Sequence, residues 1–391
     1  MMEGKNVLKN NLKIGILGGG QLGLMISQAS ISFGIGLYIL DPDSKASARP
    51  FCQHFTQGSF SDEETVYNFG KDLDIITIEI EHVNVQALYR LEREGVKVFP
   101  QPHIIELIQD KGLQKQFLKD HFFATSPFHY LETKKDLVHF VKEFPAMLKS
   151  RKGGYDGKGV KAVRNLDEAE RIIQGSFPEG PSILESWADM EKEISVMVAR
   201  SANGEVKVYD PVEMEFNPDA NLVEYLIAPA SLSPELSEKA KNLAQNIIEK
   251  LEMVGLLAVE MFVLKTGELW INEMAPRPHN SGHHTIEASF TSQFEQVLRS
   301  IIGLPLGDTS LRSPSVMLNI LGEEGYSGSV HYLGLEETLK LRGVYIHLYG
   351  KAETRPFRKM GHITVLDSEA ASAYKMAKTV KDHFKIISLD K

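Results

Sequence analysis

A short apolar strand that runs through a glycine-rich turn into a helix opens the chain. Residues Lys13–Leu17 read K-I-G-I-L, the turn reads G-G-G-Q-L-G, and apolar side chains then recur at helical spacing. A second apolar strand, Leu37–Leu40, follows and ends at Asp41. Strands that alternate with helices in this way form parallel sheets. The opening therefore predicts an α/β domain.

The glycines of this turn match a known fingerprint. Gly18, Gly20 and Gly23 satisfy the G-x-G-x-x-G pattern of Rossmann-type domains, and Asp41 stands where a dinucleotide enzyme holds a ribose. Alone, the pattern favours an NAD-binding site. It also fits a tight strand-to-helix turn without a ligand, because such turns need glycine wherever they are sharp. Both interpretations stay open at this point.

A third apolar strand, Leu73–Ile78, runs directly into two acidic residues, Glu79 and Glu81. Open α/β sheets bind ligands at the carboxyl ends of their strands, and strand periodicity places both carboxylates on one face. The alternative is a pair of solvated acids at a strand end. A last strand, Val96–Phe99, is followed by prolines, so we place the first domain boundary near residue 108.

A second glycine-rich segment, Arg151–Val160, reads R-K-G-G-Y-D-G-K-G-V. Its glycines remove the Cβ atoms that keep a backbone away from a ligand. Four basic residues lie in or beside it: Lys149, Arg151, Lys152 and Lys158. The segment is not a P-loop, because Gly159 stands where that motif needs Ser or Thr. We expect a loop that closes over phosphates; the alternative is a solvated hairpin tip.

The segment L-L-A-V-E-M-F-V-L-K-T-G-E-L-W-I-N-E predicts two strands joined by a two-residue turn within Lys265–Glu268. If the ends of that turn face each other, Glu260 lies opposite Glu273. Facing carboxylates repel across a ladder unless a cation lies between them, and oxygen ligands of this kind suit Mg²⁺ that carries phosphates. The hairpin therefore predicts a magnesium site, whereas another register would give a solvent-facing acidic pair.

Two later segments concentrate polar and basic groups. The loop P-R-P-H-N-S-G-H-H presents Arg277, His279, Asn280 and Ser281 between prolines, which lower the entropy cost of ordering it. We expect a substrate loop, because arginine can bind an anion through two N–H groups; a zinc site is the disfavoured alternative. The last segment is a basic cluster, either surface charge or a site for a phosphate monoester: Lys351, Arg355, Arg358 and Lys359.

Composition narrows the function classes. The formal net charge of -9 disfavours a general nucleic-acid surface, and the single cysteine, Cys52, offers neither an internal disulfide nor a pair of metal ligands. Apolar runs stay well short of the ~20 residues of a membrane span. The N-terminal residues lack the apolar core of a signal peptide. We expect a cytoplasmic enzyme that acts on small anions, without a membrane or nucleic-acid partner.

These segments together resemble the ATP-grasp superfamily, and within it the N5-carboxyaminoimidazole ribonucleotide synthetase family, over nearly the whole chain. The motifs that carry the resemblance are GGGQLG, EIEHVN, DKGLQKQFL, LKSRKGGYDGKGV, the pair Glu185 and Glu193, INEMAPRPHNSGH and YGKAETRPFRKMGH. The implied fold is α/β and α+β: a Rossmann-like pre-ATP-grasp domain (1–108), an ATP-grasp domain (109–310) with a mobile lid (about 122–190), and a small C-terminal domain (311–391). Members are usually dimers.

The resemblance also implies a reaction. Mg-ATP would phosphorylate bicarbonate to carboxyphosphate, and the carboxyl group would then pass to the exocyclic amine of 5-aminoimidazole ribonucleotide, a step of purine biosynthesis. The cofactors would be ATP and Mg²⁺, and the substrates the ribonucleotide and bicarbonate. Carboxyphosphate must be kept from water, which explains the need for a lid.

Site residues follow by matching positions. ATP would be bound by Lys111, Lys149, Gly154, Tyr155, Asp156, Gly157, Lys158, Gly159, Glu185, Trp187, Glu193, Asn272 and Glu273. Magnesium would be held by Glu260 and Glu273. The ribonucleotide would be bound by Glu79, Tyr155, Asp156, Arg277, His279, Asn280 and Ser281, with Lys351 and Arg358 on its 5′-phosphate. Catalytic roles would fall to Lys149, Asp156, Lys158 and Arg277.

Two positions depart from a simple match. Many family members carry a histidine near residues 212–217 that contacts the nucleotide, and this chain offers Phe216. Asn272 matches an ATP-site position, yet ideal strand alternation points it away from Glu273.

Three alternatives remain. An ATP-grasp ligase for formate or an amino acid would share the ATP residues but not the PRPHNSGH and YGK…RKMGH segments. An NAD-dependent oxidoreductase would leave the second glycine loop and the facing glutamates unexplained. A nucleotide-binding regulator without activity is disfavoured, because nothing in these motifs is degraded.

Overall fold

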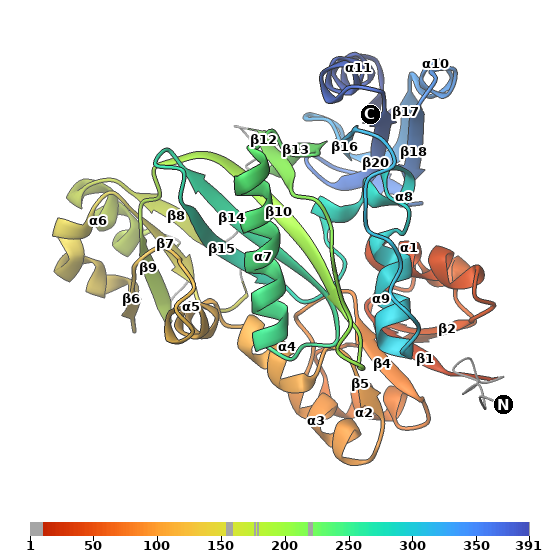
Figure 1. Ribbon diagram of the computed structural model, residues 1–391, viewed down its shortest axis with the longest axis horizontal. Helices are drawn as coiled ribbons and strands as arrows, with labels where there is room; N and C mark the ends of the chain where they lie inside the picture. The colour runs from red at the N-terminus through yellow and green to blue at the C-terminus, as the bar shows by residue number, and fades with distance from the viewer. Residues whose placement is uncertain (1–10, 154–158, 176, 178–179, 218–221, 391) are drawn as a thin grey trace.

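The computed structural model describes residues 11–153, 159–175, 177, 180–217 and 222–390 (Figure 1). Its first unit is a five-stranded sheet in which every neighbouring pair is parallel, with strand order β3-β2-β1-β4-β5. The strands are β1 (Ile14–Leu17), β2 (Leu37–Asp41), β3 (His54–Gln57), β4 (Ile75–Ile78) and β5 (Lys97–Val98). The predicted α/β opening is confirmed.

Helices cover both faces of this sheet. On one face, α2 (Glu63–Gly70) and α3 (Val85–Arg93) share a core with residues of β4. On the other face, α1 (Gln21–Ile31) packs together with α9 (Gln293–Ile302) from much later in the chain. Alternation along β1 explains this division, since Ile14 and Ile16 face α1 while Leu17 belongs to the opposite core.

A nine-stranded antiparallel sheet forms the centre of the molecule, with order β15-β14-β10-β12-β13-β16-β20-β18 and β11 beside β10. Its strands are β10 (Met190–Arg200), β11 (Val206–Val208), β12 (Val212–Asn217), β13 (Leu222–Ala228), β14 (Gly255–Leu264), β15 (Leu269–Ala275), β16 (Ser315–Leu321), β18 (Val344–Leu348) and β20 (Lys359–Leu366). The ladder continues from β13 into β16, so it crosses the domain boundary expected near residue 310.

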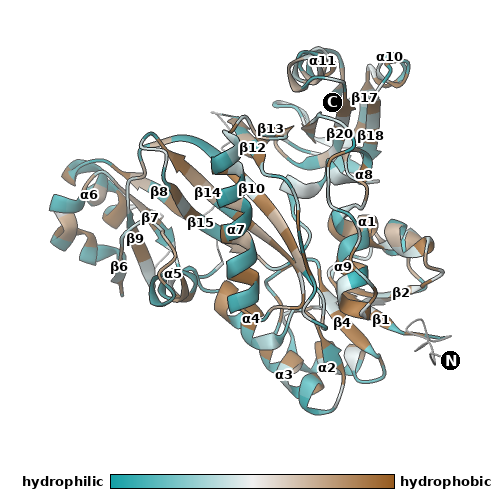
Figure 2. Ribbon diagram, viewed as in Figure 1, coloured by the Kyte–Doolittle hydropathy of each residue, from teal (hydrophilic) through white to brown (hydrophobic). Residues whose placement is uncertain are grey.

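The two faces of this sheet differ in chemistry. On β10, Ile194, Val196 and Val198 pack against α7 (Pro234–Lys250), whose N-cap is Ser233. Figure 2 shows the apolar stretches of β10 and β14 behind α7. The alternating residues of β10 point to the other face, which therefore carries the polar side chains Glu193 and Ser195.

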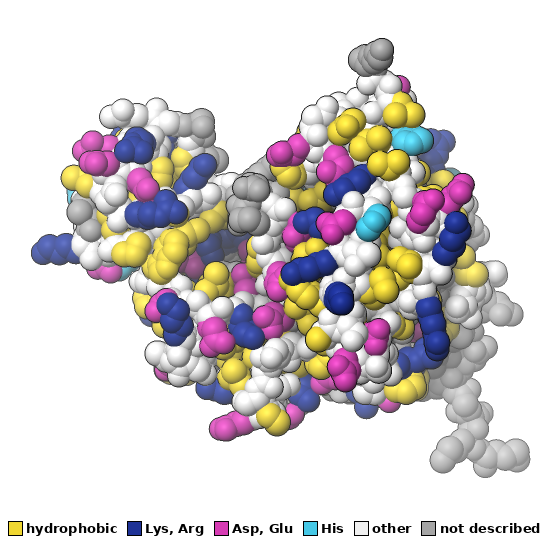
Figure 3. All heavy atoms as spheres, turned by 90° about the horizontal axis from the view of Figure 1, so that it is seen from above, with side chains coloured by type: hydrophobic (Ala, Val, Ile, Leu, Met, Phe, Trp, Pro, Cys, Tyr) yellow, Lys and Arg dark blue, Asp and Glu magenta, His cyan; other side chains and the backbone are white. Residues whose placement is uncertain are grey.

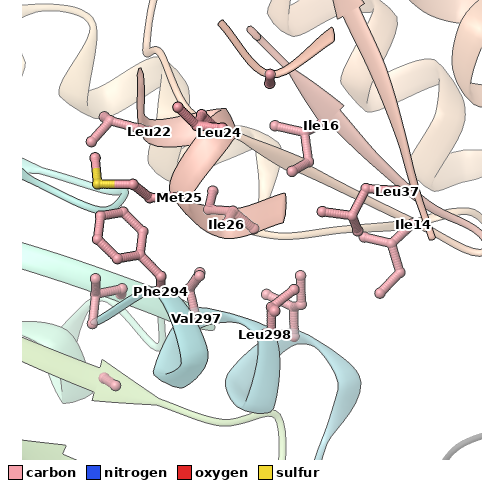
Figure 4. Packing of buried hydrophobic residues seen from close by; sticks show 14 of the residues in the cluster. Ile14, Ile16, Leu22, Leu24, Met25, Ile26, Leu37, Phe294, Val297 and Leu298 are labelled. Carbon is pink, nitrogen blue, oxygen red and sulfur yellow. The ribbon is translucent and has the colours of Figure 1, made fainter. Parts of the chain in front are cut away.

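Buried apolar contacts join the first unit to the central sheet. Met25 and Ile26 of α1 lie against Phe294, Val297 and Leu298 of α9 (Figure 4), and α9 also packs on β10 and β14. Burying an apolar side chain of this size contributes about 1.5–3 kcal/mol. The α1–α9 contact therefore fixes the glycine-rich turn relative to the central sheet.

A smaller antiparallel sheet stands apart and is called the lid below (residues 128–186). Its strand order is β6-β9-β7-β8, from β6 (Phe128–Leu131), β7 (Ala146–Ser150), β8 (Val160–Val163) and β9 (Ser182–Ser186). With α6 (Leu166–Gln174) and the 3-10 helix η2 (Lys134–Glu143) it has its own core. Figure 3 shows the lid as a lobe separated by a hollow from the rest of the molecule.

The remaining elements cover the far end of the long sheet. Helix α11 (Ala370–His383) packs on β16 and β20, and a three-stranded sheet is formed by β17 (Gly328–Leu333), β19 (Glu353–Thr354) and β21 (Lys385–Ser388). Between the units lie α4 (Pro102–Ile108), α5 (Lys111–Asp120) and α8 (Thr285–Ala288), whereas α10 (Leu335–Leu339) packs on β18 at the outer edge of the C-terminal part (Figure 1). Among the described helices, none is both long enough and apolar enough to cross a bilayer.

Candidate active site

The β14–β15 hairpin places Glu260 directly opposite Glu273, as predicted. The predicted two-residue turn, however, is wrong. The N–H of Leu264 donates to the carbonyl of Glu268, so three residues form the turn, and Gly267 takes a φ of +82° there. The ladder near the turn is therefore offset by one residue, and a bulge between Glu260 and Met261 restores the register.

The bulge inserts Asn272 as an extra residue on β15. An extra residue interrupts the alternation of side chains, so Asn272 and Glu273 line the same small cavity although they are adjacent in the chain. The Asn272 amide accepts a hydrogen bond from Lys149 Nζ at 3.1 Å and donates one to Glu193 Oε1 at 3.0 Å. The expectation that Asn272 points away from Glu273 is therefore wrong.

Three carboxylates gather on this face of the sheet. Burial and the negative charge of Glu273 together raise the pKa of Glu193 to about 7, and burial with the charges of Glu193 and Glu273 raises that of Glu260 to about 8. Two nitrogen groups lie at the edges: the Lys111 ammonium Nζ contacts Glu273 Oε1, and the His279 imidazole Nε2 lies 3.5 Å from Glu260 Oε1. Carboxylates that burial and mutual repulsion drive toward protonation are suited to a cation.

The donor set fits Mg²⁺ in part. Glu260 and Glu273 supply hard oxygen ligands from neighbouring strands. Within the described residues, no group of three His, Cys, Asp or Glu side chains is arranged to hold a metal ion. The protein would therefore supply two ligands, and the others would come from phosphate oxygens and water, which is the usual way that Mg²⁺ accompanies a nucleotide.

A buried lysine pair lies where the lid meets α5. Lys149, the last but one residue of β7, is 3.1 Å from Glu185 Oε2 on β9, and Lys115 of α5 is 3.2 Å from the same oxygen. Burial alone would raise the pKa of Glu185, but the two ammonium groups outweigh it and hold that pKa below its ordinary value. Two predicted ATP residues, Lys149 and Glu185, are thus in direct contact.

The glycine-rich turn binds carboxylates of the chain itself. The N–H groups of Gly20 and Gly23 donate to the two oxygens of Glu79, each at 2.8 Å, and the N–H of Gly19 donates to Asp41 Oδ2 at 2.7 Å. A Cβ built on Gly18 would lie 2.4 Å from Cγ of Glu79. A pyrophosphate has no room here, because Glu79 occupies its place at the helix N-terminus. The NAD-binding interpretation is therefore wrong.

Arg277 joins the substrate loop to the first sheet. Its Nε and Nη2 donate to the two oxygens of Glu81 at 2.9 and 2.6 Å. Burial alone would raise the pKa of Glu81, but the guanidinium group lowers it to about 2. Strand β4 ends at Ile78, so the expected alternation does not extend to Glu79 and Glu81, and the two carboxylates have different partners.

The remaining loop residues are ordered by each other. His279 Nδ1 lies 2.9 Å from the hydroxyl of Ser281, which in turn lies 2.7 Å from the hydroxyl of Ser195 on β10. Asn280 begins the short 3-10 helix η3 (Asn280–Gly282). Ser281 is buried, so its hydroxyl serves to hold the loop on the sheet.

A cavity of about 330 Å³ lies between the glycine-rich turn and the basic cluster of the last segment. Lys351 Nζ donates to Gln21 Oε1 at 3.4 Å and to the carbonyl of Lys359 at 2.6 Å. Burial, followed by repulsion from Arg358, lowers the pKa of Lys351 to about 8. The lining residues come from both ends of the chain: Gly20, Gln21, Asp41, Asp43, Lys45, Ala46, Ser47, Lys351, Ala352, Glu353 and Arg358.

Family models match three successive parts of the chain. They are described as a ribonucleotide synthetase preATP-grasp domain (11–109), an ATP-grasp domain (116–294) and a phosphoribosylaminoimidazole carboxylase C-terminal domain (315–376). The crystal structure of N5-carboxyaminoimidazole ribonucleotide synthetase from Thermotoga maritima is 42% identical, with a TM-score of 0.88, over 96% of this chain and 99% of that chain. The chain belongs to the N5-carboxyaminoimidazole ribonucleotide synthase family.

Two further relatives are informative. The synthase of Aspergillus clavatus, solved in complex with ADP and 5-aminoimidazole ribonucleotide, is 32% identical with a TM-score of 0.87, over 95% of this chain and 98% of that chain. The phosphoribosylaminoimidazole carboxylase of Vigna aconitifolia is 39% identical over 365 residues, which make up 92% of this chain. The chain covers 65% of that carboxylase, so it spans slightly less than two thirds of its length.

Some predicted site residues of this synthase-family chain are not placed. Gly154, Tyr155, Asp156, Gly157 and Lys158 lie outside the described residues. At the edges of that gap, the carbonyl of Gly159 accepts a hydrogen bond from Ser150, and Arg151 binds both oxygens of Asp110 at 2.8 and 2.7 Å. Trp187 follows β9 and is half-exposed beside the lid.

Phe216, where many family members carry histidine, lies on β12 two residues after Met214, which pairs with Glu193. Its ring is partly exposed, and phenylalanine has no donor for a nucleotide.

Two groups of residues and one pairing were not predicted from the sequence. Lys115 stands four residues after Lys111 and so shares its helix face, which is a signal that could have found it. Glu81 was noted, but its pairing with Arg277 depends on how two units pack. Lys45 and Ser47 line the cavity from the loop after β2, where α/β sheets commonly bind ligands.

Proposed function

We propose that this chain carboxylates 5-aminoimidazole ribonucleotide to N5-carboxyaminoimidazole ribonucleotide, with ATP and bicarbonate, through carboxyphosphate, in purine biosynthesis. The observation that carries the proposal is that the facing glutamates of β14 and β15, with the lysines beside them, and the wall of the basic cavity belong to one connected framework. A nucleotide site at the first place and a phosphate-ester site at the second would therefore be held near each other by the same sheet. The complex of the Aspergillus relative with ADP and the ribonucleotide supports this assignment.

We assign the nucleotide to the hollow between the lid and the central sheet. Lys111 and Lys149 would neutralise phosphate charge, and Glu185 with the backbone beside Trp187 would bind adenine. Glu193 would bind the ribose hydroxyls, and its hydrogen bond from Asn272 orients it for this. We also assign the segment from Gly154 to Gly159 to the phosphates, on the basis of its sequence.

Mg²⁺ would be held by Glu260 and Glu273. When bound with ATP, it supplies charge neutralisation on the phosphates, the main requirement of phosphoryl transfer. The residues of the chain would position the reactants: Lys111 of α5 contacts Glu273, and Lys149 of the lid contacts Glu185. Closure of the lid would exclude water from carboxyphosphate.

We assign the ribonucleotide to the cavity beside the glycine-rich turn. Lys351 and Arg358 would bind its 5′-phosphate, since they are cationic groups on the wall formed by the C-terminal segment. Arg277 is held by Glu81 and follows β15, four residues after Glu273. It would bind the bicarbonate-derived group. His279, Asn280, Tyr155 and Asp156 would contact the imidazole, and Glu79 would shape the wall behind Gly20.

In the first step, an oxygen of bicarbonate bonds to the γ-phosphorus of ATP as the bond to ADP breaks. In the second, the exocyclic amine bonds to the carboxyl carbon, the carbon–oxygen bond to phosphate breaks, and the amine loses a proton. Lys158 and Asp156 are proposed to act in these steps together with Lys149 and Arg277. We further propose a cytoplasmic homodimer with the three-domain division given above; light scattering of purified protein tests the dimer.

The test is the release of ADP from Mg-ATP with bicarbonate, with and without 5-aminoimidazole ribonucleotide. Turnover that needs both bicarbonate and the ribonucleotide supports the proposal. ATP turnover indifferent to the ribonucleotide would contradict the substrate assignment and favour another ATP-grasp ligase. Parallel reactions with formate and with amino acids identify the acceptor in that case.

A further inference from the structure

Glu185 has an unusual environment for a buried carboxylate. Its side chain is only 3% exposed, and its two carboxylate oxygens differ in their hydrogen bonding. Oε2 accepts from both Lys149 and Lys115, whereas Oε1 is buried and has no hydrogen-bond partner among the described residues. A buried acceptor without a donor is costly, so Oε1 is poised for a donor that the described part of the chain does not supply. Glu185 also lines the small cavity beside Asn272 and Glu273.

Lys115 determines which carboxylate oxygen of Glu185 remains without a hydrogen-bond donor. Its ammonium group has three N–H donors, and three acceptors surround it: Thr125 Oγ1 at 2.7 Å, the carbonyl of Ile271 at 3.4 Å and Glu185 Oε2 at 3.2 Å. Thr125 is itself held, because its hydroxyl donates to the same carbonyl at 2.6 Å. The ammonium group is therefore aimed at Oε2 by groups outside the lid.

Lys149 alone would not determine this orientation. Its Nζ is shared between Glu185 Oε2 and Asn272 Oδ1, both at 3.1 Å, and it belongs to the lid sheet together with Glu185. Lys115 belongs to α5, outside that sheet. The contact from Lys115 thus sets the carboxylate of Glu185 relative to the central sheet, where the rest of the nucleotide would lie.

We propose that Lys115 is a positioning residue for base selection, which holds Glu185 so that Oε1 accepts the exocyclic amine of adenine and excludes guanine. The chemistry is direct. Adenine presents an amino group at the position where guanine presents a carbonyl oxygen, and a carboxylate oxygen attracts the first and repels the second. The inference rests on the proposed use of ATP and deepens it by assigning the origin of its base specificity.

The test measures binding of ADP and of GDP, each with Mg²⁺, by titration calorimetry without the ribonucleotide. The variant is Lys115→Met, which keeps the length of the side chain and leaves Glu185 paired with Lys149. We expect ADP affinity to fall by about tenfold or more, the effect of one hydrogen bond to a charged group. GDP affinity should change less than about twofold, because GDP makes no bond to Oε1. The preference for adenine should therefore collapse.

Two further variants serve as a control and as a second test. Lys119→Met removes an exposed lysine from the same helix and should bind both nucleotides as the unaltered protein does. Thr125→Val removes one of the acceptors that orient Lys115, without removing a charge. It should lower the affinity for ADP relative to that for GDP, as Lys115→Met should, and it serves as the test if Lys115→Met does not fold.

The outcomes separate cleanly. Equal losses of ADP and GDP affinity in Lys115→Met and Thr125→Val would show that Lys115 is only structural and would overturn the inference. If the unaltered protein binds ADP with a preference over GDP, the proposed use of ATP stands whatever the variants do. If it binds neither nucleotide, the proposed function fails, and this inference fails with it.

Discussion

The pair formed by Glu81 and Arg277 should stabilise the fold strongly, and Glu81→Gln should remove most of that contribution. Both side chains are mostly buried, at 20% and 17% exposed, and two charge-assisted hydrogen bonds join them. The guanidinium group lowers the pKa of Glu81 from 4.5 to about 2. Because one pKa unit corresponds to about 1.4 kcal/mol, the difference in charge stabilisation is on the order of 3 kcal/mol.

The pH dependence follows from the direction of this shift. A carboxyl group whose pKa is lower in the folded protein stabilises the fold above its unfolded pKa. That contribution is fully present above pH 4.5 and is lost as the pH falls toward about 2. The glutamine variant lacks it at every pH. The difference between the two proteins should therefore be constant from neutral pH down to the unfolded pKa and shrink below it.

Urea unfolding at pH 7, 5 and 3.5, followed by tryptophan fluorescence and circular dichroism, measures this difference. The matched control is Glu64→Gln, which breaks an exposed ion pair with Arg90 and should leave the midpoint unchanged, since water screens such pairs. A Glu81→Gln midpoint equal to that of the control at pH 7 would refute the reasoning. A gap that does not narrow at pH 3.5 would refute the assignment to charge.

Three other changes test the site and its scaffold. Glu273→Gln should abolish Mg-dependent ATP turnover with an unchanged unfolding midpoint; a near-normal rate would remove the hairpin from the metal site. Lys351→Met should raise the KM for the ribonucleotide well above its effect on the KM for ATP, whereas the exposed Lys340→Met should change neither. Gly18→Ala should lower the free energy of unfolding, measured by calorimetry, by about 2 kcal/mol or more, because its Cβ would meet Glu79. Gly34→Ala, also at positive φ but in open space, should cost less, and the difference between the two variants gives the contribution of that contact.

Local patterns predicted the elements well. The strand–glycine–helix opening and the hairpin strands each depend on residues close in sequence, and both are present. The facing pair of Glu260 and Glu273 was predicted from a turn one residue too short, and the bulge at Asn272 compensated for the error. Periodicity cannot detect such a bulge, because one extra residue leaves the composition of the strand unchanged.

Contacts between residues far apart in the chain account for the parts of the site that could not be predicted from the sequence. A glycine-rich turn looks the same whether it holds a pyrophosphate or the carboxylate of Glu79, which lies 59 residues from Gly20. The pairing of Arg277 with Glu81 spans 196 residues. Likewise, Lys115 resembles a surface lysine until Glu185 and Thr125 are brought to it from other elements. These contacts arise from packing between units, which no local pattern encodes.

The pairing of β13 with β16 has a consequence for ligand selection. Tyr225, Leu226, Ile227 and Ala228 are joined by the backbone ladder to the strand that begins the C-terminal segment. The facing glutamates and the strands of the C-terminal segment thus belong to one hydrogen-bonded sheet, which constrains the distance from the glutamates to the basic cavity. A compound that occupies both sites must then have the right length between its two ends as well as the right chemical groups. Compounds that link a polyphosphate, bound at the facing glutamates, to a ribose phosphate should inhibit only within a narrow range of linker lengths.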